Sequence, residues 1–62
     1  MNAEELAKLF HEKYEELAPE YGYNTRKESA VPWEGVPLNN KNLMIAVCRI
    51  VLDRLRTGES EL

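Results

Sequence analysis

The apolar residues of this chain are concentrated in one stretch towards its C-terminal end, NLMIAVCRIVLDRL. At about 100° per residue, Asn42, Arg49, Asp53 and Arg56 fall on one narrow polar stripe of a helical wheel. Apart from Arg54, the other positions are apolar and cover roughly 220° of the circumference. The pattern predicts a helix whose apolar arc is wider than one partner helix can bury.

This central helix is predicted to run from about residue 39 to residue 56. Pro37 suits the first turn of a helix, and Asn39 or Asn40 could serve as its cap instead. Thr57 and Gly58 favour its end. Residues 57–62 are expected to form a frayed acidic tail.

A first helix is predicted from about residue 2 to residue 18. Asn2 is suited to the N-cap, and Glu5 stands at the spacing of a capping box. Pro19 is expected to end the helix, because its ring disfavours the α conformation of the residue before it. The apolar face recurs at intervals of three and four, at Leu6, Leu9, Phe10, Tyr14 and Leu17.

Residues 19–38 alternate turn formers with aromatic side chains and predict an ordered loop rather than a linker. Gly22 permits a positive φ between two tyrosines, and a single helical turn is expected around Trp33. Tyr21, Tyr23 and Trp33 supply apolar area for closing a small core. The predicted fold class is mainly all-α: one domain, residues 1–62, with two helices joined by an ordered aromatic and proline-containing loop.

A chain of 62 residues supplies little core by itself and needs a disulfide, a metal or self-association. Cys48 is the only cysteine and lies on the apolar side of the central helix, so a reduced, buried thiol is expected. The spacing of a metal site is absent from the sequence. We therefore predict a homo-oligomer, with no metal or cofactor. Its interface on the central helix is predicted at Met44, Val47, Cys48, Val51 and Leu55.

The formal net charge of −3 and a sequence pI near 5.1 argue against duplex nucleic acid as a partner. The middle of the chain nevertheless contains three basic residues, Arg26, Lys27 and Lys41. The sequence shows no targeting segment and no apolar run of membrane length, which favours a cytoplasmic protein without a membrane partner.

His11, Lys13 and Tyr14 lie at or near the apolar arc of the first helix, and two interpretations are open for them. His11 can be a structural or solvated residue while Lys13 extends its amine to water. Alternatively, the three side chains line a ligand pocket or contact a partner. Neither interpretation includes catalysis, because the orienting carboxylate and nucleophile that it requires are missing nearby.

Several segments of the chain resemble a group of short uncharacterised bacteriophage proteins. The resemblance covers about residues 9–52 and extends more weakly to the ryanodine-receptor (RyR) repeat, through its helix, Gly-Tyr turn, tryptophan-proline loop and second helix. It implies a small accessory product made in the host bacterial cytoplasm, of the kind that often acts against host defence. The matching positions are Phe10, His11, Tyr14, Ala18-Pro19-Glu20-Tyr21-Gly22-Tyr23, Thr25-Arg26, Val31-Pro32-Trp33, Pro37, Asn40 and Leu43-Met44-Ile45-Ala46-Val47.

The favoured hypothesis is a sponge that binds and sequesters a nucleotide-derived immune signal without altering it. Tyr23 and Trp33 can stack on a base, while cationic side chains and the first amides of the central helix can meet phosphate. The predicted ligand-binding set is Tyr14, Tyr23, Arg26, Lys27, Trp33, Asn40 and Lys41. The alternative is a protein-binding inhibitor of a host defence factor, acting through an acidic surface or an apolar patch. An enzyme is disfavoured, since the sequence contains no nucleophile–base pair and no glycine-rich phosphate loop.

Overall fold

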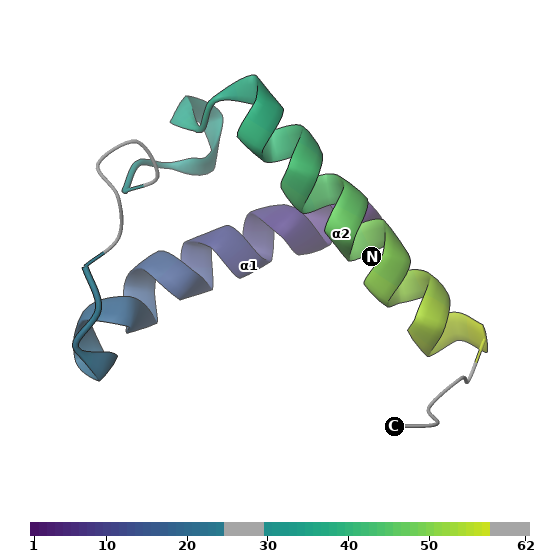
Figure 1. Cartoon of the computed structure of the whole chain (residues 1–62), viewed down its shortest axis with the longest axis horizontal. Helices are drawn as coiled ribbons and strands as arrows, with labels where there is room; N and C mark the ends of the chain where they lie inside the picture. Colours follow the sequence, from purple (N-terminus) through teal and green to yellow (C-terminus); the bar gives the residue numbers. More distant parts are fainter. Residues whose placement is uncertain (25–29, 58–62) are drawn as a thin grey trace.

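The computed structural model describes residues 1–24 and 30–57, which form two crossing helices and two short 3-10 turns (Figure 1). Helix α1 spans Ala3–Leu17 and is followed by η1, Ala18–Tyr21. The turn η2, Trp33–Gly35, precedes helix α2, Leu38–Thr57. The described part of the chain contains no strand. The predicted mainly helical class is confirmed, and both helices begin and end within a residue or two of the expected positions.

Helix α1 begins with the predicted capping box. The Glu5 backbone N–H donates to the Asn2 side-chain oxygen over 2.8 Å, and the Asn2 backbone N–H donates to Glu5 Oε1 over 3.0 Å. Two N–H groups that the helix itself leaves without partners are therefore satisfied. Glu4 and Glu5 also place negative charge at the positive end of the helix dipole.

The end of α1 lies where Pro19 predicts it, but the expected cause is wrong. Ala18 keeps α-helical angles, φ −53° and ψ −44°, although it precedes the proline. The regular hydrogen-bonding pattern ends because Pro19 has no N–H to donate. The chain then tightens into η1 and closes with a Schellman motif: Tyr23 N–H donates to the Ala18 carbonyl, and Gly22 N–H to the Pro19 carbonyl.

Helix α2 begins immediately after Pro37, whose carbonyl accepts the Lys41 N–H over 2.9 Å. Asn39 and Asn40 lie inside the first turn, so the alternative in which one of them caps the helix is wrong. Val36 is extended, with φ −70° and ψ 135°, because the ring of Pro37 disfavours the α conformation of the residue before it. At the other end Thr57 is the last helical residue, and its hydroxyl donates to the Arg54 carbonyl.

The core is a small cluster where α1, η2 and α2 meet. It contains Ala7, Trp33, Val36 and Cys48, and of these only Trp33 is large. Ala7 is completely buried, so α1 presents almost no side chain at this point and its partners pack close to the helix backbone. The expected buried, reduced thiol of Cys48 and the expected burial of Trp33 are both confirmed. No large side chain among the described residues is fully buried.

His11 is a structural residue that holds the loop against α1. Its side chain is buried, and Nε2 donates to the backbone carbonyl of Val31 over 2.7 Å. Its ring also lies 6.0 Å from the ring of Trp33, at a tilted angle. The structural interpretation of His11 therefore holds, and the histidine faces the core side of α1.

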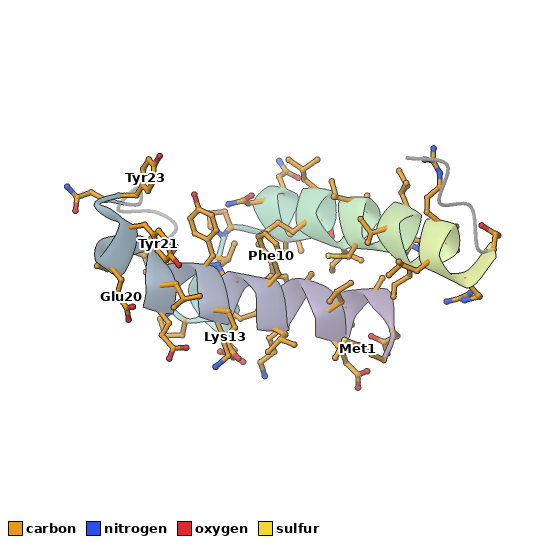
Figure 2. All side chains as sticks on the ribbon, turned by 90° about the horizontal axis from the view of Figure 1, so that it is seen from below. Met1, Phe10, Lys13, Glu20, Tyr21 and Tyr23 are labelled. Carbon is orange, nitrogen blue, oxygen red and sulfur yellow. The ribbon has the colours of Figure 1, made fainter. Side chains whose placement is uncertain are left out.

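Tyr21 and Tyr23 do not close the core, contrary to the expectation from the sequence. They are 74% and 67% exposed. Figure 2 shows both beyond the end of α1, away from the helix crossing, whereas Phe10 points from α1 towards α2. The Schellman turn carries the chain out of line with α1 before it returns to the core at Trp33.

Replacing Trp33 by alanine is expected to cost roughly 3 to 5 kcal/mol of unfolding free energy, because it empties the only large position in the core. A domain of this size has little more than that in total. Urea unfolding followed by circular dichroism measures the loss. Leu38→Ala, which removes an exposed apolar side chain, is the control and should unfold near the parent midpoint. Equal midpoints for Trp33→Ala and the parent would contradict the assignment.

Candidate functional site: an apolar groove on α1

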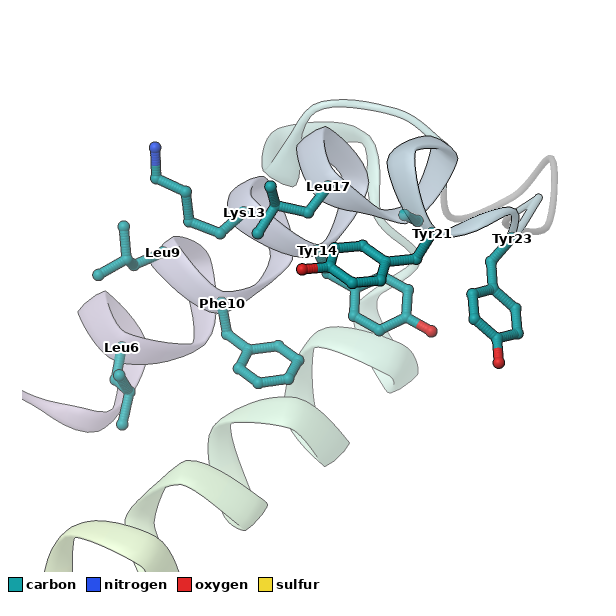
Figure 3. A pocket seen from close by; sticks show the side chains of 9 residues that line it. Leu6, Leu9, Phe10, Lys13, Tyr14, Leu17, Tyr21 and Tyr23 are labelled. Carbon is teal, nitrogen blue, oxygen red and sulfur yellow. The ribbon is translucent and has the colours of Figure 1, made fainter.

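One open groove of about 590 Å³ follows the side of α1 and continues over η1 to Tyr23 (Figure 3). Its size is within the range of ligand and peptide sites. We call it the α1 groove, and it is lined by Leu6, Leu9, Phe10, Lys13, Tyr14, Leu17, Ala18, Tyr21 and Tyr23.

The helical period of the sequence produces this groove. On the α1 wheel, Leu6, Phe10 and Leu17 lie roughly 60–100° to one side of buried Ala7. The rings of Phe10 and Tyr14, one turn apart, stack with centroids 6.1 Å apart. The same apolar face that packs into the core therefore extends beyond the region that α2 covers.

A glycine in the left-handed region positions the far end of the groove. Gly22 has φ +82°, and the turn that it permits directs the chain so that Tyr23 lines the groove together with Ala18. In a Schellman motif the residue after the glycine usually packs against the last turn of the helix. Tyr23 and Ala18 occupy those two positions.

The groove offers apolar contact with few polar groups. Lys13 is its only charged lining residue, and its Nζ is paired with Glu16 Oε1 at 3.1 Å. The hydroxyls of three tyrosines supply the other polar atoms. This chemistry suits a predominantly apolar partner, such as one face of an amphipathic helix, more than a ligand that carries several phosphates.

The predicted ligand-binding residues are divided between two places. Tyr14 and Tyr23 line the α1 groove. Lys13 lines it too, which agrees with the interpretation that places Lys13 in a ligand pocket or partner contact. Trp33 and Lys41 lie elsewhere, with the Lys41 amine 5.6 Å from the Trp33 ring centroid in a cation–π contact. Asn40 is half-buried in the first turn of α2. Arg26 and Lys27 lie outside the described residues.

The surroundings of Trp33 and Lys41 carry acidic groups. The shallow depression beside them is also lined by Glu4, Glu5 and Glu34. Lys8 lies in the same depression, and its Nζ is 3.7 Å from a Glu34 carboxylate oxygen. Carboxylates at these positions repel an approaching phosphate, and Trp33 as a whole residue is only 6% exposed.

The residues predicted for the oligomer interface on α2 fall into two groups: some are covered within one chain and others are exposed. Cys48 is buried and Met44 packs against the core, so both are already covered within one chain. Val47, Val51 and Leu55 remain exposed, at 51%, 43% and 71%. Leu43 and Ile50, which the predicted interface omitted, are also largely exposed.

No family model, curated protein or solved structure matches this chain. Among the described residues no helix is both long and apolar enough to cross a bilayer. The same residues include no group of three or more His, Cys, Asp or Glu side chains that could hold a metal ion. Conclusions about the site therefore rest on its own geometry.

Sequence reasoning missed the groove as a unit. The sequence predicts Leu6, Leu9, Phe10, Tyr14 and Leu17 as one apolar face of the first helix, without indicating which part of it the core uses. The apolar face of α1 is wider than the strip that packing against a single helix buries, so an uncovered remainder could have been inferred from the sequence. The contribution of η1 was not visible in the periodicity, since it depends on the turn at Gly22.

Gly22→Ala is expected to destabilise the fold by about 1 to 2 kcal/mol, because a Cβ is strained at a positive φ even where nothing crowds it. It should also alter the fluorescence of the groove tyrosines, since the turn positions Tyr23. The matched control is Gly35→Ala, whose added Cβ would meet Val31 at an ordinary contact distance of 3.4 Å. Equal midpoints in urea unfolding for the two variants would contradict this role of Gly22.

Proposed function

We propose that this chain is a non-enzymatic protein-binding protein whose α1 groove takes an amphipathic helix of a polypeptide partner. The observation that carries the proposal is the groove itself, an open and almost wholly apolar surface on a chain with a very small core. A soluble protein rarely leaves a contiguous apolar patch of this kind uncovered unless something binds there.

The composition of the groove supports a polypeptide as the bound class. Its aromatic residues are one phenylalanine and three tyrosines, and aromatic side chains are enriched at the energetically dominant positions of protein interfaces. Phe10 and Tyr14 are 59% and 52% exposed, so each has substantial apolar area left to bury. An elongated apolar groove along a helix matches the binding of a second helix through residues spaced by three and four.

The resemblance to short bacteriophage proteins supplies the biological context of the proposal. In that context the chain acts in the host bacterial cytoplasm as an accessory product that inhibits a host defence protein. It does so by association and not by chemistry. The apolar-patch form of inhibition is supported by the groove, and the mimicry of nucleic acid by an acidic surface has no comparable support.

Sequestration of a nucleotide signal stays a prediction. Two of its residues, Arg26 and Lys27, lie outside the described part of the chain. Of the others, Trp33 is buried and already contacts Lys41, while Tyr23 lies in a different depression. These placements support the polypeptide class over the nucleotide class.

A photo-crosslinking amino acid at Tyr14 tests the class of molecule bound. We expect irradiation in bacterial cells to join this position to a polypeptide, because Tyr14 lies in the groove and is half-exposed. The matched control is the same amino acid at Glu12, an exposed position outside the groove lining, two residues away and therefore roughly 200° around the helix. Mass spectrometry identifies the adducts, and equal polypeptide crosslinking at both positions, or none at Tyr14, would sink the proposal.

Isothermal titration against cyclic dinucleotides and ADP-ribose derivatives tests the nucleotide hypothesis separately. Under the proposed function we expect no member of this panel to bind the parent protein. If one binds, Arg26→Ala should lower its affinity by about 10- to 150-fold, since a charge-assisted hydrogen bond contributes about 1.5 to 3 kcal/mol. Tight binding that Arg26→Ala weakens in this range would replace the proposed function with the sponge.

A further inference from the structure

The single chain exposes more surface than a folded monomer of its mass. Its accessible surface is 5164 Å², whereas a folded monomer of 7.2 kDa exposes about 4,100 Å² by the usual scaling of surface with mass. Large apolar side chains on both helices contribute to this surface, among them Phe10, Tyr14 and Ile50, which are 59%, 52% and 59% exposed.

Helix α2 carries a complementary feature on its outer side. Leu43, Val47, Ile50 and Arg54 follow one another at intervals of four, three and four, and we call this set the α2 stripe. On the helical wheel it lies roughly 100–160° from buried Cys48, so it faces away from the core of its own chain. Its three apolar members are 64%, 51% and 59% exposed. This spacing is the one that a groove-binding helix presents.

The two helices carry opposite net charges. Residues 3–21, which form α1 and η1, contain six acidic and two basic residues, a net charge of −4. Residues 38–57, which form α2, contain four basic and one acidic residue, a net charge of +3. An α2 helix approaching the α1 groove of another molecule is therefore electrostatically favoured, whereas two α2 helices approaching each other are not.

We infer that a second copy of this chain occupies the α1 groove by inserting its α2 stripe. The inference rests on the proposed function and names the occupant of the groove in the free protein, so a host polypeptide binds there by displacing the second copy. A two-fold pair satisfies both contacts at once, since each molecule gives its stripe and its groove to the other, and no copy of either surface is left open. Within the pair Arg54 approaches the acidic side of the partner's α1, and apolar Val47 and Ile50 meet the groove aromatics.

This arrangement differs from an interface made by α2 alone. A seam between two α2 helices would bring Arg54 near its own copy and would leave the α1 groove uncovered. It would also use Met44 and Cys48, which are already packed inside one chain. Apart from Leu6 and Ala18, the pairing of groove with stripe uses side chains that the single chain leaves exposed.

Cysteine crosslinking tests the pairing directly. Two proteins are made in a Cys48→Ala background, one with Leu17→Cys in the groove and a tagged one with Val47→Cys in the stripe. Each is checked by circular dichroism for helix content equal to that of its background. After the two are mixed and mildly oxidised, we expect the disulfide between Leu17→Cys and Val47→Cys to form faster and in larger amount than either symmetric disulfide. The control pair replaces Leu17→Cys with Glu12→Cys, an exposed position roughly 140° around α1 from Leu17 and outside the groove lining, and should give little mixed disulfide.

Sedimentation equilibrium of the unmodified parent protein gives the second readout. We expect a dimer at micromolar concentration that weakens as salt is added, because opposite charges are screened. A predominance of the symmetric Val47→Cys disulfide would assign the interface to α2 alone and overturn the inference. A monomeric parent protein would also overturn the inference. In that case, crosslinks from Tyr14 to foreign polypeptides would still support the proposed function. If the mixed disulfide, the dimer and the Tyr14 crosslinks were all absent, both the inference and the proposed function would be wrong.

Discussion

The close approach of α1 and α2 at Ala7 is the contact on which the rest of the structure depends. Ala7 has no exposed surface, and Cys48 and Trp33 complete the same cluster. Small side chains let the helices come close, but they also limit the apolar area that the crossing can bury, at about 25 cal/mol per Å². The chain thus gains a defined crossing at the expense of core volume. A larger side chain at Ala7 would separate the elements that make up the whole core.

The exposed apolar surface follows from this constraint. Because the crossing uses only one strip of each helix, the remaining apolar positions on α1 and α2 stay uncovered in one chain. The two uncovered sets differ in form, since one is a groove that ends in tyrosines and the other a row of aliphatic side chains with an arginine. The helices that carry these sets have opposite net charges, which makes association of α2 with α1 of another copy more favourable than association of like helices. Stability and binding are thereby linked through different faces of the same two helices.

Much of the fold was predictable from the sequence, because local rules determine it. The capping box at Asn2, the positive φ of Gly22, the short turn at Trp33 and both helix ranges follow from residue types at fixed spacings. The candidate site was less predictable. Periodicity identified the apolar face of α1 but not which part of it the core would use, since this depends on where the helices cross. The exposure of Tyr21 and Tyr23 depends on the direction in which the chain leaves α1 after the Schellman turn. The helical wheel of α1 does not give this direction.

The hydrogen bond from His11 to Val31 joins residues 20 positions apart in the sequence. Closing a flexible loop of this length costs about 2.7 kcal/mol of chain entropy plus a constant, while one hydrogen bond returns only about 1 kcal/mol net. The bond therefore cannot form early in folding by itself. It needs the burial of Trp33, two residues further along, at the same moment. Loop docking and core formation should accordingly be a single kinetic event, after which α1 and α2 have little remaining freedom to separate without the whole chain unfolding.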